Sequence, residues 1–127
     1  MSDNDMQAEI VLEHYREPHN YGTLENATVS MTESNPVCGD TVNISLLIED
    51  GAVKDVKFVG KGCSISQASA SMLTDRIMGK SLEELKEIDE ESVIDMIGLK
   101  LGPSREKCAL LSFNTLQKCI KEYQSSQ

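Results

Sequence analysis

The stretch "TVNISLLIEDGAVKDVKFVG", residues 41–60, decides the fold, because it consists of two alternating runs around a turn dipeptide. Apolar side chains take alternate positions in both runs: Val42, Ile44, Leu46 and Ile48, then Val56 and Phe58. A period of two is typical of a strand that buries one face. Asp50-Gly51, between the runs, is a strong hairpin signal. Residues 41–60 therefore predict an antiparallel β-hairpin.

The segments on either side of this hairpin supply one more strand and several helices. "ATVSMTE", residues 27–33, alternates in the same way and predicts a third strand. Periodicity of three and four, with capping and stop signals, predicts helices over residues 8–16, 64–78, 81–88, 92–97 and 103–123. This order predicts an α+β fold, a three-stranded antiparallel sheet with helices packed on one face, in a single domain over residues 1–127.

Composition and charge narrow the functional classes. A chain of 127 residues with 39% hydrophobic content can bury a core without disulfides. The formal net charge of −9 repels phosphate backbones, so we expect no nucleic-acid partner. No apolar run approaches the ~20 residues that cross a bilayer, and "MSDNDMQAEI" does not resemble a signal peptide. We therefore expect no membrane association and a cytoplasmic location.

Four cysteines in such a chain are thiols, metal ligands or catalytic groups rather than disulfides. Cys38 precedes a predicted strand, Cys63 stands at the start of a predicted helix, and Cys108 lies in the first turns of the last helix. Helix N-termini stabilise thiolates, which favours reactive or ligating cysteines there. Cys119 lies on the apolar stripe of the last helix, about 16 Å from Cys108 along the axis, and is expected in the core.

A carboxylate accompanies the first cysteine, since Asp40 follows Cys38 by two positions. Thiolates suit zinc or iron–sulfur centres, whereas a carboxylate is a harder ligand that holds a thiophilic centre less firmly. Asp40 could instead be a turn residue that accepts backbone N–H bonds. The candidate site, if the fold gathers it at one end of the sheet, is Cys38, Asp40, Cys63 and Cys108. His14 and His19 are interpreted as structural histidines rather than ligands.

Four motifs in order resemble the iron–sulfur cluster scaffold family that comprises IscU, SufU and the N-terminal domain of NifU. They are "LEHYREPHNYGTLENA", "NPVCGDTV", "GKGCSISQASASMLTD" and "REKCALLSFNTL". The resemblance covers almost the whole chain and implies a SufE/NifU-like fold. It also implies that Cys38, Cys63 and Cys108 are cluster ligands, with Asp40 at the position associated with cluster lability.

The function implied by the resemblance is assembly rather than catalytic turnover. A pyridoxal-phosphate cysteine desulfurase would pass persulfide sulfur to a site thiol, for which we favour Cys108, with Cys38 as the alternative. Iron would join the sulfur to build a [2Fe-2S] or [4Fe-4S] cluster, which is then passed to apo-proteins. A homodimer around a shared cluster is left open.

Departures from the family pattern leave alternatives. Lys107 replaces the histidine that precedes the third cysteine in IscU-type members, so the fourth ligand could be Asp40, and Lys107 could pair with Asp40 without metal. "LGPSR", residues 101–105, replaces the "LPPVK" segment that engages the IscU chaperone.

A zinc-dependent sulfurtransferase of SufU type is the second hypothesis, although the insertion of that type is missing. A purely structural zinc domain ranks last, because such sites normally lack carboxylate ligands.

Overall fold

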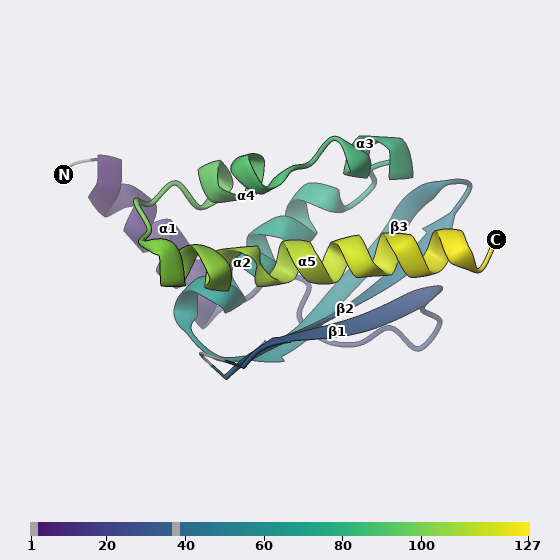
Figure 1. Cartoon of the computed structure of the whole chain (residues 1–127), viewed down its shortest axis with the longest axis horizontal. Helices are drawn as coiled ribbons and strands as arrows, with labels where there is room; N and C mark the ends of the chain where they lie inside the picture. Colours follow the sequence, from purple (N-terminus) through teal and green to yellow (C-terminus); the bar gives the residue numbers. More distant parts are fainter. Residues whose placement is uncertain (1–2, 37–38) are drawn as a thin grey trace.

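A computed structural model of the chain describes residues 3–36 and 39–127. In chain order the elements are α1 (Asp3–Arg16), β1 (Val29–Asn35), β2 (Asp40–Glu49), β3 (Ala52–Lys61), α2 (Ser64–Ile77), α3 (Leu82–Lys86), α4 (Glu90–Ile97) and α5 (Pro103–Ser125). The helices lie on one side of a three-stranded sheet, and α2 and α5 contact its strands (Figure 1). The predicted α+β architecture is confirmed.

The sheet is an antiparallel meander in the order β1-β2-β3. Ile44, in the centre of β2, pairs with Met31 of β1 and with Phe58 of β3. The predicted hairpin turn is present, and both of its residues have positive φ, 54° at Asp50 and 75° at Gly51. Such angles match the right-handed twist of the flanking strands, which is why the Asp-Gly dipeptide marks this turn.

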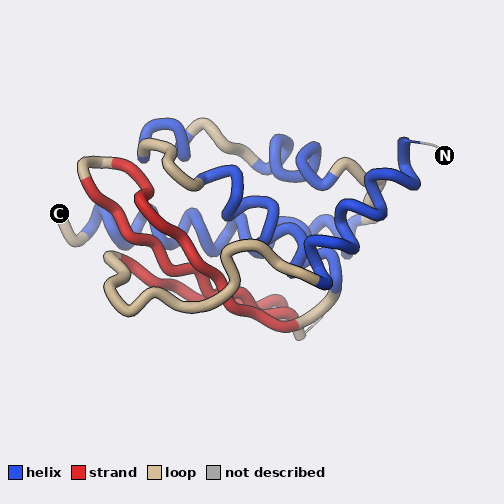
Figure 2. Tube along the Cα trace, turned by 180° about the vertical axis from the view of Figure 1, so that it is seen from behind, coloured by secondary structure: helices blue, strands red, loops and turns tan. Residues whose placement is uncertain are grey.

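The outer edge of β3 is covered by the segment that joins α1 to β1 (Figure 2). Gly22 N–H donates to the Phe58 carbonyl at 2.8 Å, and Phe58 N–H donates to the Asn20 carbonyl at 2.9 Å. These bonds satisfy backbone groups that an open strand edge would offer to other chains. The segment also places Tyr21 against the sheet, beside the end of β3.

The main core lies between the sheet and the two central helices. Buried apolar side chains from all three strands meet those of α2 and α5. Small residues on α2 allow close approach, and buried Ser69 Oγ donates to the Ala109 carbonyl of α5 at 2.6 Å. Cys119 is fully buried in this core, as predicted, and burial raises the pKa of its thiol to about 12.

Several helix limits differ from the prediction: α3 covers Leu82–Lys86 rather than residues 81–88, α5 extends to Ser125 rather than 123, and two helices begin earlier than predicted. The first helix begins at Asp3, earlier than residue 8. The fourth begins at Glu90 because Asp89 caps it in a capping box with Ser92, which the sequence interpretation placed at the helix start. Ser81 and Glu84 form a capping box at the start of α3. Within the described ranges, no helix combines the length and the apolar character that crossing a bilayer requires.

The register of the hairpin positions the candidate site. Thr41 pairs with Lys61, so the first residue of β2 lies beside the chain that leaves β3. Only Gly62 and Cys63 separate that strand from the first residue of α2. The start of β2 and the start of α2 therefore meet at one end of the sheet.

Candidate metal site

Three of the four predicted site residues come together at this end of the molecule. Asp40, Cys63 and Cys108 each offer one ligand atom, and these atoms lie within 4.8 Å of one another. They come from the start of β2, the N-terminus of α2 and the early part of α5. Cys38, the fourth member, lies outside the described residues.

Asp40 is a buried carboxylate with only 1% of its surface exposed. Its Oδ1 accepts the Cys63 backbone N–H at 2.8 Å, and its Oδ2 accepts the Cys63 thiol at 3.5 Å. Asp40 therefore accepts a backbone N–H bond, as its alternative role as a turn residue requires, and it also lies beside a thiol. One oxygen fixes the loop that leads into α2, and the other points at the sulfur.

Gly62 makes room for this carboxylate. Its φ is +135°, and a Cβ built there would lie 2.1 Å from Asp40 Oδ1. Real Cβ atoms do not approach an oxygen that closely, so any side chain at this position would displace Asp40 or strain the backbone. Sequence reasoning did not find this steric role, because it depends on where the Asp40 carboxylate lies in the fold.

The two described site cysteines differ in their relation to their helices. Cys63 is the N-cap of α2, partly exposed, and its Sγ accepts the Ser66 N–H at 3.5 Å. Cys108 is the sixth residue of α5 and is 4% exposed. The unpaired N–H groups of a helix belong to its first turn, so the helix-terminus argument applies to Cys63 and does not extend to Cys108.

A small pocket connects the two thiols with solvent. Its volume is about 240 Å³, and its lining residues are Cys63, Ser64, Ile65, Ser104, Arg105 and Cys108. The Arg105 guanidinium is always charged and is the one cation of this lining. An anionic sulfur group on either thiol would therefore share this pocket with the positive charge of Arg105.

Lys107 does not take the role that the sequence left open for it. Among the residues that the structure describes, no ion pair joins Lys107 to Asp40. Lys107 is exposed and lines a different pocket, with Glu90 and Asn114. The hypothesis of a Lys107–Asp40 pair is therefore not supported by the geometry.

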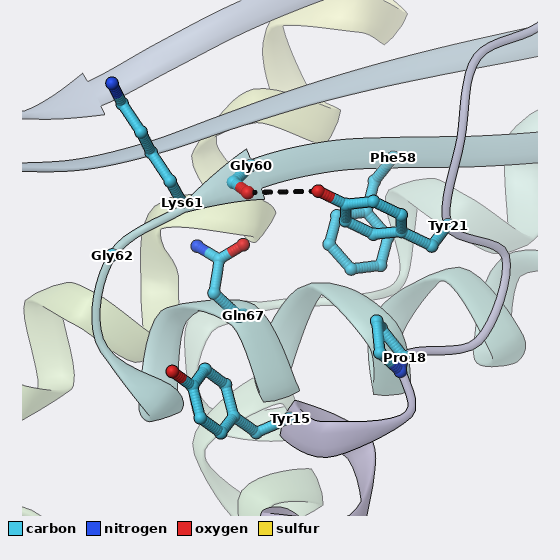
Figure 3. A pocket seen from close by; sticks show the side chains of 8 residues that line it. All are labelled: Tyr15, Pro18, Tyr21, Phe58, Gly60, Lys61, Gly62 and Gln67. Atoms are coloured by element: carbon cyan, nitrogen blue, oxygen red, sulfur yellow. Dashed lines mark hydrogen bonds between the residues drawn. The ribbon is translucent and has the colours of Figure 1, made fainter.

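An aromatic groove of about 320 Å³ adjoins the site at Gly62 (Figure 3). Half-exposed Tyr15 and Tyr21 stand at its rim, and the Tyr21 ring meets Phe58 edge to face at 5.3 Å. The Tyr21 hydroxyl donates to the Gly60 carbonyl at 3.3 Å, which holds the ring over the end of β3. Lys61 and Gln67 also line the groove.

The two histidines lie apart from the cysteines, and each has a hydrogen-bond partner. His14 Nδ1 shares a hydrogen bond with Ser71 Oγ at 2.7 Å, and His19 Nδ1 contacts Asp75 Oδ2 at 2.5 Å. Burial lowers the pKa of His14, and the neighbouring His19 lowers it further.

Comparison with known proteins gives consistent matches over nearly the whole chain. Residues 6–127 match the family model described as NifU-like N terminal domain. An iron-sulfur cluster assembly scaffold protein IscU of Thermotoga maritima is 37% identical, over 92% of this chain and 94% of that protein. The zinc-dependent sulfurtransferase SufU of Bacillus subtilis is 36% identical, over 88% and 87%.

A solved structure supports the same relationship. It is a putative iron-sulfur cluster assembly scaffold protein for the SUF system from Fervidobacterium islandicum, 31% identical, with a TM-score of 0.76. The match covers 94% of this chain and 99% of that one.

Proposed function

The chain belongs to the NifU-like N-terminal domain family, and we propose that it is a scaffold on which an iron–sulfur cluster is assembled and then transferred to apo-proteins. The observation that carries this proposal is the convergence of Asp40, Cys63 and Cys108 within 4.8 Å at one end of the sheet. Two thiols and a carboxylate are a donor set that suits iron or zinc.

The proposed ligands are the four residues Cys38, Asp40, Cys63 and Cys108, of which the first lies outside the described residues. Asp40 is the proposed labile ligand, because a hard carboxylate binds a thiophilic centre less firmly than a thiolate does. Its Oδ1 is already engaged by the Cys63 N–H, which leaves Oδ2 as the oxygen beside the sulfur. A cluster held this way could leave by releasing its oxygen ligand first.

Sulfur would arrive from a cysteine desulfurase that carries a persulfide. The thiolate of Cys108 attacks the terminal sulfur, a new S–S bond forms, and the desulfurase cysteine leaves as a thiolate. The pocket shared with Arg105 supports Cys108 as acceptor, because it opens the thiol to solvent beside a cation. Cys38 is the alternative acceptor. We place this exchange in the cytoplasm and leave the cluster type and a shared-cluster homodimer to experiment.

A second candidate function is zinc-dependent sulfur transfer, which the match to the SufU of Bacillus subtilis favours. Zinc would then occupy the same residues and be displaced as a cysteine takes sulfur. The same geometry serves both functions, so the chemistry of the loaded protein must separate them.

Anaerobic reconstitution with iron and sulfide separates the two functions. A coloured cluster that activates an apo-acceptor supports the scaffold. Zinc that resists replacement by iron, together with persulfide relay and no cluster formation, would favour the transferase and contradict the scaffold proposal. Cys108→Ser removes one of the proposed ligands. Its matched control is Lys107→Ala, which changes the charge next to Cys108 and leaves the ligand set intact.

A further inference from the structure

A second group of metal-ligating side chains gathers on the surface between α1, the loop after it and α2. His14 comes from α1, His19 from the loop, and Asp75 from the last turns of α2. One ligand atom of each lies within 4.8 Å of the others, and the two imidazole centroids are 4.4 Å apart. We propose that these three residues bind a divalent transition metal of the zinc class, at a site separate from the cysteines.

The chemistry of the three donors suits such an ion. Two imidazoles and one carboxylate form a ligand set that zinc and related metals use in proteins when a further position stays open to water or a partner group. Ligating histidines normally donate their other ring N–H to a fixed acceptor. In the tautomer whose Nδ1–H donates to buried Ser71 Oγ, the Nε2 of His14 carries the lone pair that a metal requires.

The surroundings orient the remaining two donors. Ser71 Oγ also accepts the His19 backbone N–H at 2.8 Å, which ties the loop to the same hydroxyl as the His14 ring. Asn20 Nδ2 donates to Asp75 Oδ1 at 2.9 Å, so that the other oxygen, Oδ2, faces His19 Nδ1. This support is the kind of outer hydrogen bonding that holds metal ligands in place.

The adjustment that a metal would require is small. Ligand atoms about 2.1 Å from a tetrahedral zinc lie roughly 3.4 Å apart, so separations of up to 4.8 Å must close by up to about 1.4 Å. The side chains of His19 and Asp75 are 53% and 45% exposed, and rotation of these two can supply that movement. The metal would take the place of the hydrogen bond that now joins them.

The histidine–aspartate site and the cysteine site are independent. Asp75 follows Cys63 by twelve residues on the same helix, which corresponds to about 18 Å along its axis. No residue belongs to both groups, and their donors differ: one offers nitrogen and oxygen only, whereas the other offers two sulfurs beside the Asp40 oxygen. Spectroscopy can therefore tell which site a metal occupies.

Anaerobic titration of the whole chain with Co²⁺ tests the proposal. Co²⁺ at the cysteines gives thiolate-to-metal charge-transfer absorption, whereas Co²⁺ on nitrogen and oxygen gives only weak ligand-field bands. We expect two equivalents in the wild type, one of each kind. His19→Gln and Asp75→Asn should weaken the second equivalent at least tenfold and keep the charge-transfer band. Asp95→Asn, the same change at an exposed position on α4, should keep both.

Two results would overturn the proposal. One is a wild type that takes up only thiolate-bound cobalt, and the other is a second equivalent that persists unchanged in both variants. A measurement on the wild type removes any dependence on how the variants fold. In its NMR spectrum the second equivalent must shift the ring protons of His14 and His19, and unshifted rings would contradict the assignment.

Discussion

Replacing Gly62 by alanine perturbs the candidate metal site without removing any ligand. The new Cβ would lie 2.1 Å from Asp40 Oδ1 and 2.7 Å from its Cγ, so the carboxylate must move by about 1 Å or more. That movement breaks the 2.8 Å bond from the Cys63 N–H, and a hydrogen bond to a charged group contributes about 1.5–3 kcal/mol. The positive φ of +135° adds about 1–2 kcal/mol of backbone strain for alanine.

Gly62→Ala is therefore expected to lower the free energy of unfolding of the metal-free protein by about 2.5–5 kcal/mol. Zinc affinity should fall at least tenfold, because Asp40 Oδ2 no longer faces the Cys63 sulfur. Urea unfolding and competition with a chelating dye measure the two effects. Gly51→Ala is the matched control: it has a φ of +75° and nothing within 4 Å of the new Cβ, so it should lose about 1–2 kcal/mol and keep its zinc affinity. If the two variants behave alike, Gly62 does not act by making room for Asp40.

Asp40→Ala should lengthen the lifetime of a reconstituted cluster and slow its transfer to an apo-acceptor. The decay of visible absorption measures this lifetime, and a faster decay than in the wild type would contradict the role of Asp40 as a labile ligand. The same variant leaves the Cys63 N–H without its partner, so the metal-free protein should lose about 1–3 kcal/mol in urea unfolding. Lys107→Ala should leave zinc affinity unchanged within twofold, since Lys107 faces another pocket, and a large loss would restore the idea that it completes the site. Cys119, whose pKa is raised from 9.0 to about 12, favours the folded state fully below pH 9 and loses this contribution as the pH rises toward 12. Iodoacetamide at pH 9 should therefore modify Cys119 only in denaturant, as peptide mass spectrometry can show, and modification of the native protein at this residue would be evidence against its burial.

The elements were predictable where the signal is local. Alternation with a period of two and the Asp50-Gly51 turn depend on neighbouring residues alone, and β2, β3 and their turn follow the prediction. The start of α4 was placed late because Ser92 was interpreted as the first helical residue. Its side chain instead bonds back to the Asp89 N–H, three residues earlier, as the partner in a capping box.

The site was only partly predictable, because its geometry depends on register. The positions of three cysteines at element ends and the family resemblance indicated three ligands, but the contact between Asp40 and Cys63 requires that Thr41 pair with Lys61. The role of Gly62 depends on where the carboxylate lies, which no sequence pattern states. Lys107 precedes Cys108 by one position, and on a helix that separation turns a side chain to a different face. The meeting of Asp75 with two histidines more than 50 residues away likewise follows from packing of α1 against α2.

X-ray absorption at the iron edge, on anaerobically reconstituted protein, measures the proposed coordination most directly. The expected first shell consists of sulfur with one oxygen ligand, and the oxygen contribution should change in Asp40→Ala while the sulfur shell stays. A shell of nitrogen and oxygen alone, or a sulfur shell that survives in both Cys63→Ser and Cys108→Ser without change, would show that these residues do not hold the metal.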